Sequence, residues 1–479
     1  MTCTVTCHYG TLQGTQEKQC TAFYNVPYAK GNGRFRYAIA PDAWQGVYDA
    51  TKPGAIFPQK RSRLYTIMGE QENLPQDENA FTLNIWTPDT KGSYPVCIWI
   101  HGGRWLTGGA GLSWYHGSNL AHQNLVVVSV QYRLGVLGNL YQPEISDGNL
   151  AVHDLISAVL WIKENISAFG GDTGQITIAG QSAGAWYTVI LLGIEQLRGT
   201  FQRAILCSFP GGVTPLCKND AAKMSQLLLN ELHITNVHEL ATISAQDLLN
   251  AESKVSEEMQ RRKNQMMEPV FLPYADSIYV QKDIIKAAAE NSQGSLQLMT
   301  GITAQETMAF LNDSSIADHN KVYQTIVQIS TQHIFLNPTI ALLNQFSAQG
   351  NAVYAYHFAY PCKNTKIQAC HCIDLPFIFG NFDCWESAPM CHFDSTEETQ
   401  ALSTNLQSSL IQFMKEGIPD NQAASFWPQY DKTERKALQF WHHCKPYKLT
   451  NRPLIQLQIH CFLFISKCKS LWYTATHKL

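Results

Sequence analysis

The chain has 479 residues, of which 35 are basic and 38 are acidic, and its formal net charge is −3. This balance excludes a basic nucleic-acid binder, because phosphate affinity needs an excess of lysine and arginine on one face. Apolar residues reach 45% and charged residues only 15%, a composition that excludes an intrinsically disordered chain.

The 14 cysteines of the chain raise the question of its redox compartment. Residues Met1–His8 lack the cationic start and the apolar run of roughly 7–15 residues that mark a secretory signal. The apolar stretch Leu454–Ile465 is too short and too polar to span a bilayer. We therefore expect a cytoplasmic protein without stable membrane insertion, in which most thiols are free.

Short aliphatic and β-branched runs recur along the chain, and several are followed by small residues. Continuous apolar runs of this length are typical of strands that are buried on both faces, as in a parallel sheet. The sequence predicts strands of this kind at Val96–Ile100, Leu125–Val130, Ile176–Ala179, Ala204–Cys207, Leu296–Met299 and Ala352–Phe358.

A helix is predicted between the second and third of these strands, since apolar residues there recur near helical spacing. Its apolar positions are Leu150, Val152, Leu155, Ile156, Val159 and Leu160. Alternation of strand and helix indicates an α/β fold with a mostly parallel central sheet and helices on both faces.

Two further segments differ in charge and pattern. Residues 252–263 carry alternating charges, which favour a solvated helix face over a docking surface. Residues 445–479 mix lysine, cysteine, histidine and aromatic residues without a clear period, and no element is predicted there. We expect one α/β domain over residues 1–444 and a C-terminal tail of unknown structure over residues 445–479.

The pentapeptide Gly180–Gly184 reads Gly-Gln-Ser-Ala-Gly and follows the predicted strand Ile176–Ala179. A G-x-S-x-G match is weak by itself, and a glycine-rich loop with a capping serine is the alternative interpretation. Here an apolar, helix-like stretch, Trp186–Leu192, comes next. Strand, sharp turn and helix form the setting that exposes a nucleophilic serine, so Ser182 is the candidate nucleophile.

A serine hydroxyl needs a general base, and the base needs an orienting acid. On an α/β-hydrolase fold the acid and then the histidine follow the serine along the chain. Glu306 lies in the loop after the strand Leu296–Met299, where a parallel sheet presents its site. His357 lies within a predicted strand, whereas His371 lies in the loop beyond it, and we favour His371 as the base.

The tetrahedral intermediate of acyl transfer needs backbone N–H groups that point at its oxyanion. His101-Gly102-Gly103-Arg104-Trp105 follows the strand Val96–Ile100, in the loop that supplies such donors in this fold. Ala183, which follows the serine, is expected to supply another donor. The alternative is that the two glycines only permit a tight turn.

Ordered motifs over about residues 10–443 resemble the type-B carboxylesterase family, which also contains cholinesterases and neuroligins. They are Phe23–Ala29, Arg34-Phe35, Leu83–Pro88, Tyr132–Gly135, Asn165–Asp172, the serine pentapeptide, the loops of Glu306 and His371, and Trp427–Tyr430. The resemblance implies an α/β-hydrolase fold and a serine hydrolase without metal or organic cofactor. It implies a catalytic triad of Ser182, Glu306 and His371, with Gly103, Arg104 and Ala183 as oxyanion donors.

The chain departs from the family pattern at several positions. Gln181 replaces the usual glutamate before the serine, and Arg104 replaces a usual glycine or alanine. Phe57 and Ala80 stand where the family commonly has a disulfide, which agrees with a reducing compartment. Residues 58–79 lack the tryptophan with which cholinesterases bind a quaternary ammonium, so choline esters are not the expected substrates.

The sequence therefore predicts a carboxylesterase-type serine hydrolase that acts on a small-molecule carboxylic ester through an acyl-enzyme. Two alternatives stay open. One is a binding protein on the same fold, as in neuroligins, and the other is a lipase or thioesterase with a different pocket. Cys370-His371-Cys372 is the only tight Cys/His group near the site, and its spacing does not favour a metal site. The oligomeric state is left open.

Overall fold

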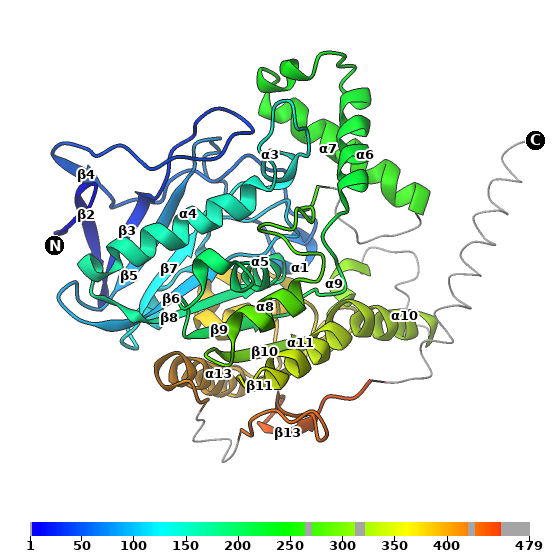
Figure 1. Cartoon of the computed structure of the whole chain (residues 1–479). Helices are drawn as coiled ribbons and strands as arrows, with labels where there is room; N and C mark the ends of the chain where they lie inside the picture. The colour runs from blue at the N-terminus through cyan, green and yellow to red at the C-terminus, as the bar shows by residue number, and fades with distance from the viewer. Residues whose placement is uncertain (1, 264–270, 312–320, 420–426, 452–479) are drawn as a thin grey trace, which may run out of the picture.

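One 13-stranded sheet runs through the computed structural model, which describes residues 2–263, 271–311, 321–419 and 427–451 (Figure 1). Its central part is parallel, and all the strands predicted from apolar runs lie in it. In spatial order the parallel strands are β7 (Val126–Val130), β6 (Tyr94–Ile100), β8 (Gly171–Gln181), β9 (Arg203–Cys207), β10 (Gln297–Thr303), β11 (Ala352–Phe358) and β12 (Lys436–Phe440), of which β12 was not predicted.

Antiparallel strands extend the sheet at both edges. On the β7 side they are β5 (Thr82–Thr87), β3 (Cys20–Pro27), β2 (Gly10–Glu17) and β1 (Thr2–Cys7), while β4 (Val47–Asp49) pairs with β2. On the other side β13 (Lys445–Lys448) pairs with β12. The sheet therefore continues four residues into the expected C-terminal tail, and residues 452–479 lie outside the described residues.

Helices cover both faces of the sheet, because alternate side chains of its buried strands enter two separate cores. Ile98 belongs to one core and its neighbour Trp99 to the other. The first core is covered by α4 (Leu150–Asn165), α5 (Ala183–Leu192), α8 (Ile284–Ser292) and α11 (Asn337–Ala348), and the second by α2 (Ser118–Ala121), α12 (Leu375–Phe379) and α13 (Thr396–Glu416). The helix predicted over 150–160 is confirmed as part of α4, although Leu160 is exposed.

A third, smaller core joins α3 (Gly135–Asn139), α6 (Lys218–Glu231) and α7 (Ala245–Lys263). Figure 1 shows α6 and α7 at the upper right, beside the sheet rather than over its faces. The other short elements are α1 (Tyr65–Met68), α9 (Met308–Leu311), α10 (Lys321–Thr331), η1 (Ser113–Tyr115), η2 (Ile166–Phe169), η3 (Glu195–Leu197), η4 (Val237–Ala241), η5 (Gln332–Leu336), η6 (Phe382–Trp385) and η7 (Pro389–Cys391). Within the described ranges, no helix is both long and apolar enough to cross a membrane.

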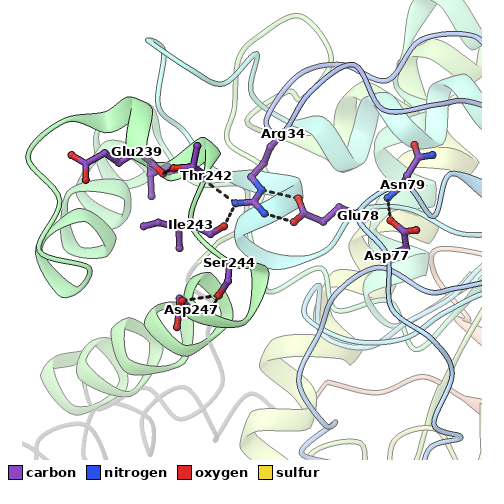
Figure 2. A network of polar contacts seen from close by, with 10 residues as sticks. Arg34, Asp77, Glu78, Asn79, Glu239, Thr242, Ile243, Ser244 and Asp247 are labelled. Atoms are coloured by element: carbon purple, nitrogen blue, oxygen red, sulfur yellow. Dashed lines mark hydrogen bonds and ion pairs between the residues drawn. The ribbon is translucent and has the colours of Figure 1, made fainter.

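The side chain of Arg34 links the N-terminal part of the chain to the segment that precedes α7 (Figure 2). Its guanidinium forms an ion pair with Glu78, and Nε donates to Glu78 Oε2 over 2.7 Å. It also donates to the carbonyl oxygens of Leu240, over 3.1 Å, and of Ile243. These contacts fix the start of α7, the helix that forms one wall of the cavity described below.

The charged run at 252–263 is helical and has a solvated face that includes Lys254 and Glu257, but the other side of the helix is buried. Glu252 is 5% exposed, and Val255 and Ser256 are buried with it. The pattern of alternating charges did not reveal that α7 packs against α3 and α6 through this side.

Candidate active site

The three residues predicted as a triad follow three strands of the parallel sheet. Ser182 follows β8, Glu306 lies just beyond β10, and His371 lies in the loop between β11 and α12. Since the strands run in the same direction, their carboxyl ends meet at one edge. The structure brings Ser182 and His371 to the same cavity and places Glu306 against His371.

Ser182 occupies a sharp turn between β8 and α5, with φ 55° and ψ −122°. Its backbone N–H donates to the carbonyl oxygen of Cys207 over 2.9 Å. A Cβ on Gly184 would lie 2.0 Å from the Ile100 oxygen, and one on Gly180 would lie 2.5 Å from the Gly184 backbone. Both glycines are therefore required by close backbone approach, and the predicted strand, turn and helix around Ser182 are confirmed.

His371 and Glu306 form a buried pair. The ring Nδ1 lies 2.6 Å from Glu306 Oε2, and the side chains are 1% and 0% exposed. Glu306 Oε1 accepts the N–H of Thr303 over 2.8 Å, which holds the carboxylate in place. With a proton on Nδ1, the ring keeps Nε2 as its acceptor atom toward the cavity.

Two opposing effects set the pKa of His371. Burial alone would lower it, but the contacts with Cys372 and with the Glu306 carboxylate raise the pKa well above its ordinary value. The negative charge of Glu306 favours the imidazolium, which is the form that a general base reaches after it accepts a proton.

Gln181 occupies the acceptor side of the histidine. Its amide Nε2 lies 3.2 Å from His371 Nε2 and 3.3 Å from Cys372 Sγ. No hydrogen bond joins Ser182 Oγ to His371 Nε2 in this arrangement. Hydrogen bonds of catalytic groups are often long or absent without substrate and form when it binds. Here the Gln181 amide takes the position at Nε2 that a serine hydroxyl would need.

Asp374 is a second buried carboxyl group near the pair, and the sequence reasoning gave it no role. The Tyr356 hydroxyl donates to its Oδ2 over 3.3 Å. Burial, together with the charge of Glu306, raises the pKa of Asp374 to about 7. Near neutral pH Asp374 is therefore only partly ionised, and the contact with the histidine is made by Glu306.

The loop after β6 takes a left-handed conformation at three successive residues, with φ 120° at Gly103, 57° at Arg104 and 62° at Trp105. A Cβ on Gly103 would lie 1.9 Å from the Thr107 oxygen, so only glycine fits there. Among the described residues, no acceptor is recorded for the backbone N–H groups of Gly103, Arg104 and Ala183. Three unengaged N–H groups next to a serine elbow are suited to hold an oxyanion.

The cavity above Ser182 has a volume of about 510 Å³. Its floor contains Gly103, Arg104, Ser182 and His371, as the sequence predicts. Its wall and mouth contain charged residues that the sequence reasoning missed, namely Lys60, Arg61, Arg63 and Glu252. The dense basic run at 60–63 was the available signal, but nothing in the sequence connected it to Ser182.

His357 and the cysteines remain structural in the described chain. His357 lies within β11, bonds Gln439 over 2.9 Å, and has a pKa lowered to about 4 by burial. The twelve cysteines in the described residues are all free. Phe57 is fully buried and packs edge to face against Phe81, in place of the family disulfide at 57 and 80. No metal-binding group of three or more ligands occurs among the described residues.

Sequence comparison agrees with this geometry. The model of the Carboxylesterase family matches residues 2–317 and 312–453. Para-nitrobenzyl esterase of Bacillus subtilis is 33% identical over 91% of this chain and 94% of its own. A probable N-octanoylanthranilate hydrolase of Rhodococcus erythropolis is 32% identical over 91% of this chain and 97% of its own.

Solved structures give the same result. A thermophilic PNB esterase superposes with a TM-score of 0.82 at 28% identity, over 93% of this chain and 97% of that one. The carboxylesterase of Geobacillus stearothermophilus superposes with a TM-score of 0.80 at 26% identity, with the same coverage. The chain belongs to the carboxylesterase family and has its α/β-hydrolase fold.

Proposed function

We propose that this protein is a serine carboxylic-ester hydrolase whose triad is Ser182, Glu306 and His371. The observation that carries the proposal is the 2.6 Å contact between Glu306 and His371, both fully buried, beside a serine held in a strained elbow. This contact supplies the orienting acid and the base that a serine nucleophile needs.

In the acylation step, His371 Nε2 accepts the proton of Ser182 Oγ while Oγ attacks the ester carbonyl. Glu306 stabilises the imidazolium that forms. The oxyanion of the tetrahedral intermediate receives hydrogen bonds from the N–H groups of Gly103, Arg104 and Ala183. His371 then protonates the leaving alcohol, and the acyl group stays on Ser182.

Deacylation follows the same route with water as the nucleophile. His371 removes a proton from the water molecule, the same N–H groups hold the second oxyanion, and the carboxylic acid is released as Ser182 regains its proton. Each step uses side chains and backbone groups only, so the proposed mechanism requires no cofactor. The substrate is a small-molecule carboxylic ester that fits a cavity of about 510 Å³.

A lipid substrate is the less favoured alternative. An apolar surface over residues 220–290 would support it, but among the described residues of that stretch only Ile278 is a strongly exposed large apolar side chain. The cavity lining includes four cationic side chains, Lys60, Arg61, Arg63 and Arg104. A charged entrance of this kind suits a polar ester better than a long acyl chain.

The direct test compares hydrolysis of a short-chain p-nitrophenyl ester by wild type and Ser182→Ala. We expect kcat to fall about 10⁴-fold or more, since loss of the nucleophile removes the whole covalent route. Ser167→Ala, an exposed serine remote from the cavity, is the matched control and should retain wild-type turnover. Wild-type turnover equal to that of Ser182→Ala contradicts the proposal.

A further inference from the structure

Among the described residues that line it, the cavity above Ser182 has an excess of positive charge. Four cationic side chains line it, and among the described lining residues Glu252 is the only carboxylate. Arg61 forms an ion pair with Glu70. Within the described part of the chain, the other three cations have no ion-pair partner: Lys60, Arg63 and Arg104.

Arg104 follows Gly103 in the loop after β6 and is half-buried, whereas Arg61 and Arg63 are exposed. No hydrogen bond or ion pair to its guanidinium is recorded among the described residues, although the group carries five N–H donors. Burial and the nearby charge of Arg63 lower the pKa of Arg104 to about 10. Two like charges in a partly dry cavity repel each other, and an anion between them would relieve the repulsion.

Glu252 balances this charge only in part. Its Oε1 accepts the N–H of Val136 over 2.9 Å. Burial raises the pKa of Glu252 to about 8 and outweighs the nearby charge of Lys60, which lowers it. Near pH 7 the carboxyl group is therefore mainly neutral, and most of the positive charge of the described lining is left for a ligand to balance.

We propose that the esters hydrolysed at this site carry a second, ionised carboxylate, which the Arg104 guanidinium binds and the charges of Lys60 and Arg63 attract. The inference rests on the proposed function of Ser182. A guanidinium matches a carboxylate through two parallel hydrogen bonds. Because Arg104 also contributes an N–H to the proposed oxyanion hole, the bound carboxylate and the reacting carbonyl would lie in the same part of the cavity.

The test uses two matched pairs of esters. Mono-4-nitrophenyl adipate and its methyl ester differ in charge on the acyl side, and 4-acetoxybenzoate and its methyl ester differ in charge on the leaving-group side. We expect kcat/KM for the anionic member of at least one pair to exceed that of its neutral partner by about tenfold. A ratio of one or less in both pairs overturns the inference.

Variants identify the residues responsible. Arg104→Gln should bring the ratio of anionic to neutral kcat/KM to about one, and Lys60→Gln with Arg63→Gln should lower it severalfold. Arg61→Gln is the matched control, since Arg61 already pairs with Glu70, and should keep the ratio within about twofold. Because a general loss of activity lowers kcat/KM for both esters equally, it does not change the ratio between them. A preference that survives both the Arg104 and the double variant overturns the inference.

Binding of adipate separates this inference from the proposed function. Calorimetry on Ser182→Ala should detect adipate binding that weakens about tenfold in Ser182→Ala with Arg104→Gln. If the wild type hydrolyses no ester, the proposed function fails, and the calorimetric result alone then decides whether the anion site exists. Absence of adipate binding to Ser182→Ala, alongside normal hydrolysis of neutral esters, overturns only the anion site.

Discussion

The floor and the mouth of the cavity are built in different ways. At the floor, Ser182, Glu306 and His371 follow strand ends, and each is held by backbone geometry or by a short buried contact. At the mouth, Lys60 and Arg63 lie in an irregular segment between β4 and α1, and the buried Glu252 lies in the wall, on α7. Under the proposed function, the triad at the floor performs the reaction, and Arg104 with the charged residues of the wall and mouth selects the esters.

This difference shows where the protein departs from its family. The floor keeps all three residues of the proposed triad, and the departures concern groups that contact these residues or line the cavity. Gln181 places an uncharged amide against His371, and Arg104 adds a cation beside the oxyanion loop. We expect substitutions at the floor to reduce kcat strongly, and those around it to change pH dependence, selectivity or stability.

The largest effect outside Ser182 is expected from Glu306→Gln. The amide keeps the size of the side chain but cannot stabilise the imidazolium and can hold the wrong tautomer, so kcat should fall about 10³- to 10⁴-fold. Steady-state kinetics with a p-nitrophenyl ester measure the loss. Glu290→Gln, on the solvent side of α8, controls for the loss of a carboxylate elsewhere, and a fall below tenfold for Glu306→Gln would contradict the orienting role.

The pH dependence of kcat/KM separates the effect of Glu306 on the pKa of His371 from the effect of Gln181. Because Glu306 and Cys372 raise the pKa of His371, kcat/KM should decline on acidification through a pKa above the ordinary 6.5. The base is active only when neutral, so activity is present above that pKa and lost below it. Gln181→Glu adds a negative charge beside the ring and should move this limb to still higher pH.

Gln181→Ala is the matched control for that shift, since it removes the amide without adding charge. Loss of the amide that donates to neutral Nε2 should raise the pKa of His371 only slightly, so its acidic limb should move to higher pH much less than that of Gln181→Glu. An acidic limb of the wild type at or below the ordinary histidine pKa would show that burial, and not the Glu306 carboxylate, dominates at His371.

The smallest expected effect concerns the contribution of the buried Glu252 carboxyl group to the free energy of unfolding. The pKa of Glu252 is about 8 in the folded chain, against an ordinary value of 4.5. Unfolding therefore releases a proton between these values, and stability falls as pH rises from 4.5 to 8. Glu252→Gln removes this loss and should raise Tm at pH 8 by about 1–3 °C relative to wild type.

The same comparison at pH 5 should show a smaller difference, because Glu252 is then mostly protonated in the folded chain and only partly ionised in the unfolded one. Thermal unfolding followed by circular dichroism at the two pH values provides the measurement. An equal Tm difference at both values would mean that the buried carboxyl group does not titrate as described.

The sequence predicted the parallel centre of the sheet because its strands are buried on both faces and appear as continuous apolar runs. It missed β1, β2, β4 and β13, whose half-buried or exposed positions give a weaker signal. It also missed β3, β5 and β12, although their positions are mostly buried. The loops of Ser182, Glu306 and His371 could be assigned because each follows a recognisable strand. The cationic lining of the cavity could not be predicted. Lys60 and Arg104 are far apart in the sequence, and only tertiary packing brings them to the same cavity.

The same limit explains Gln181 and Glu252. Sequence alone shows that Gln181 removes a charge, but only the structure shows its amide 3.2 Å from His371 Nε2. For Glu252, a position in a charged run predicted exposure, and packing of α7 against α3 buried it instead. Periodicity reports the usual environment of a residue type, and functional cavities are places where that expectation fails.

Covalent labelling is the most direct test of whether Ser182 is an activated nucleophile. The folded protein is treated with a fluorophosphonate probe, and the modified peptide is identified by mass spectrometry. We predict one covalent adduct in the wild type, on Ser182. Its formation should be strongly slowed by Glu306→Gln and should not occur in Ser182→Ala. A folded wild-type protein that stays unlabelled at Ser182 would contradict the account and favour a binding protein on the same fold.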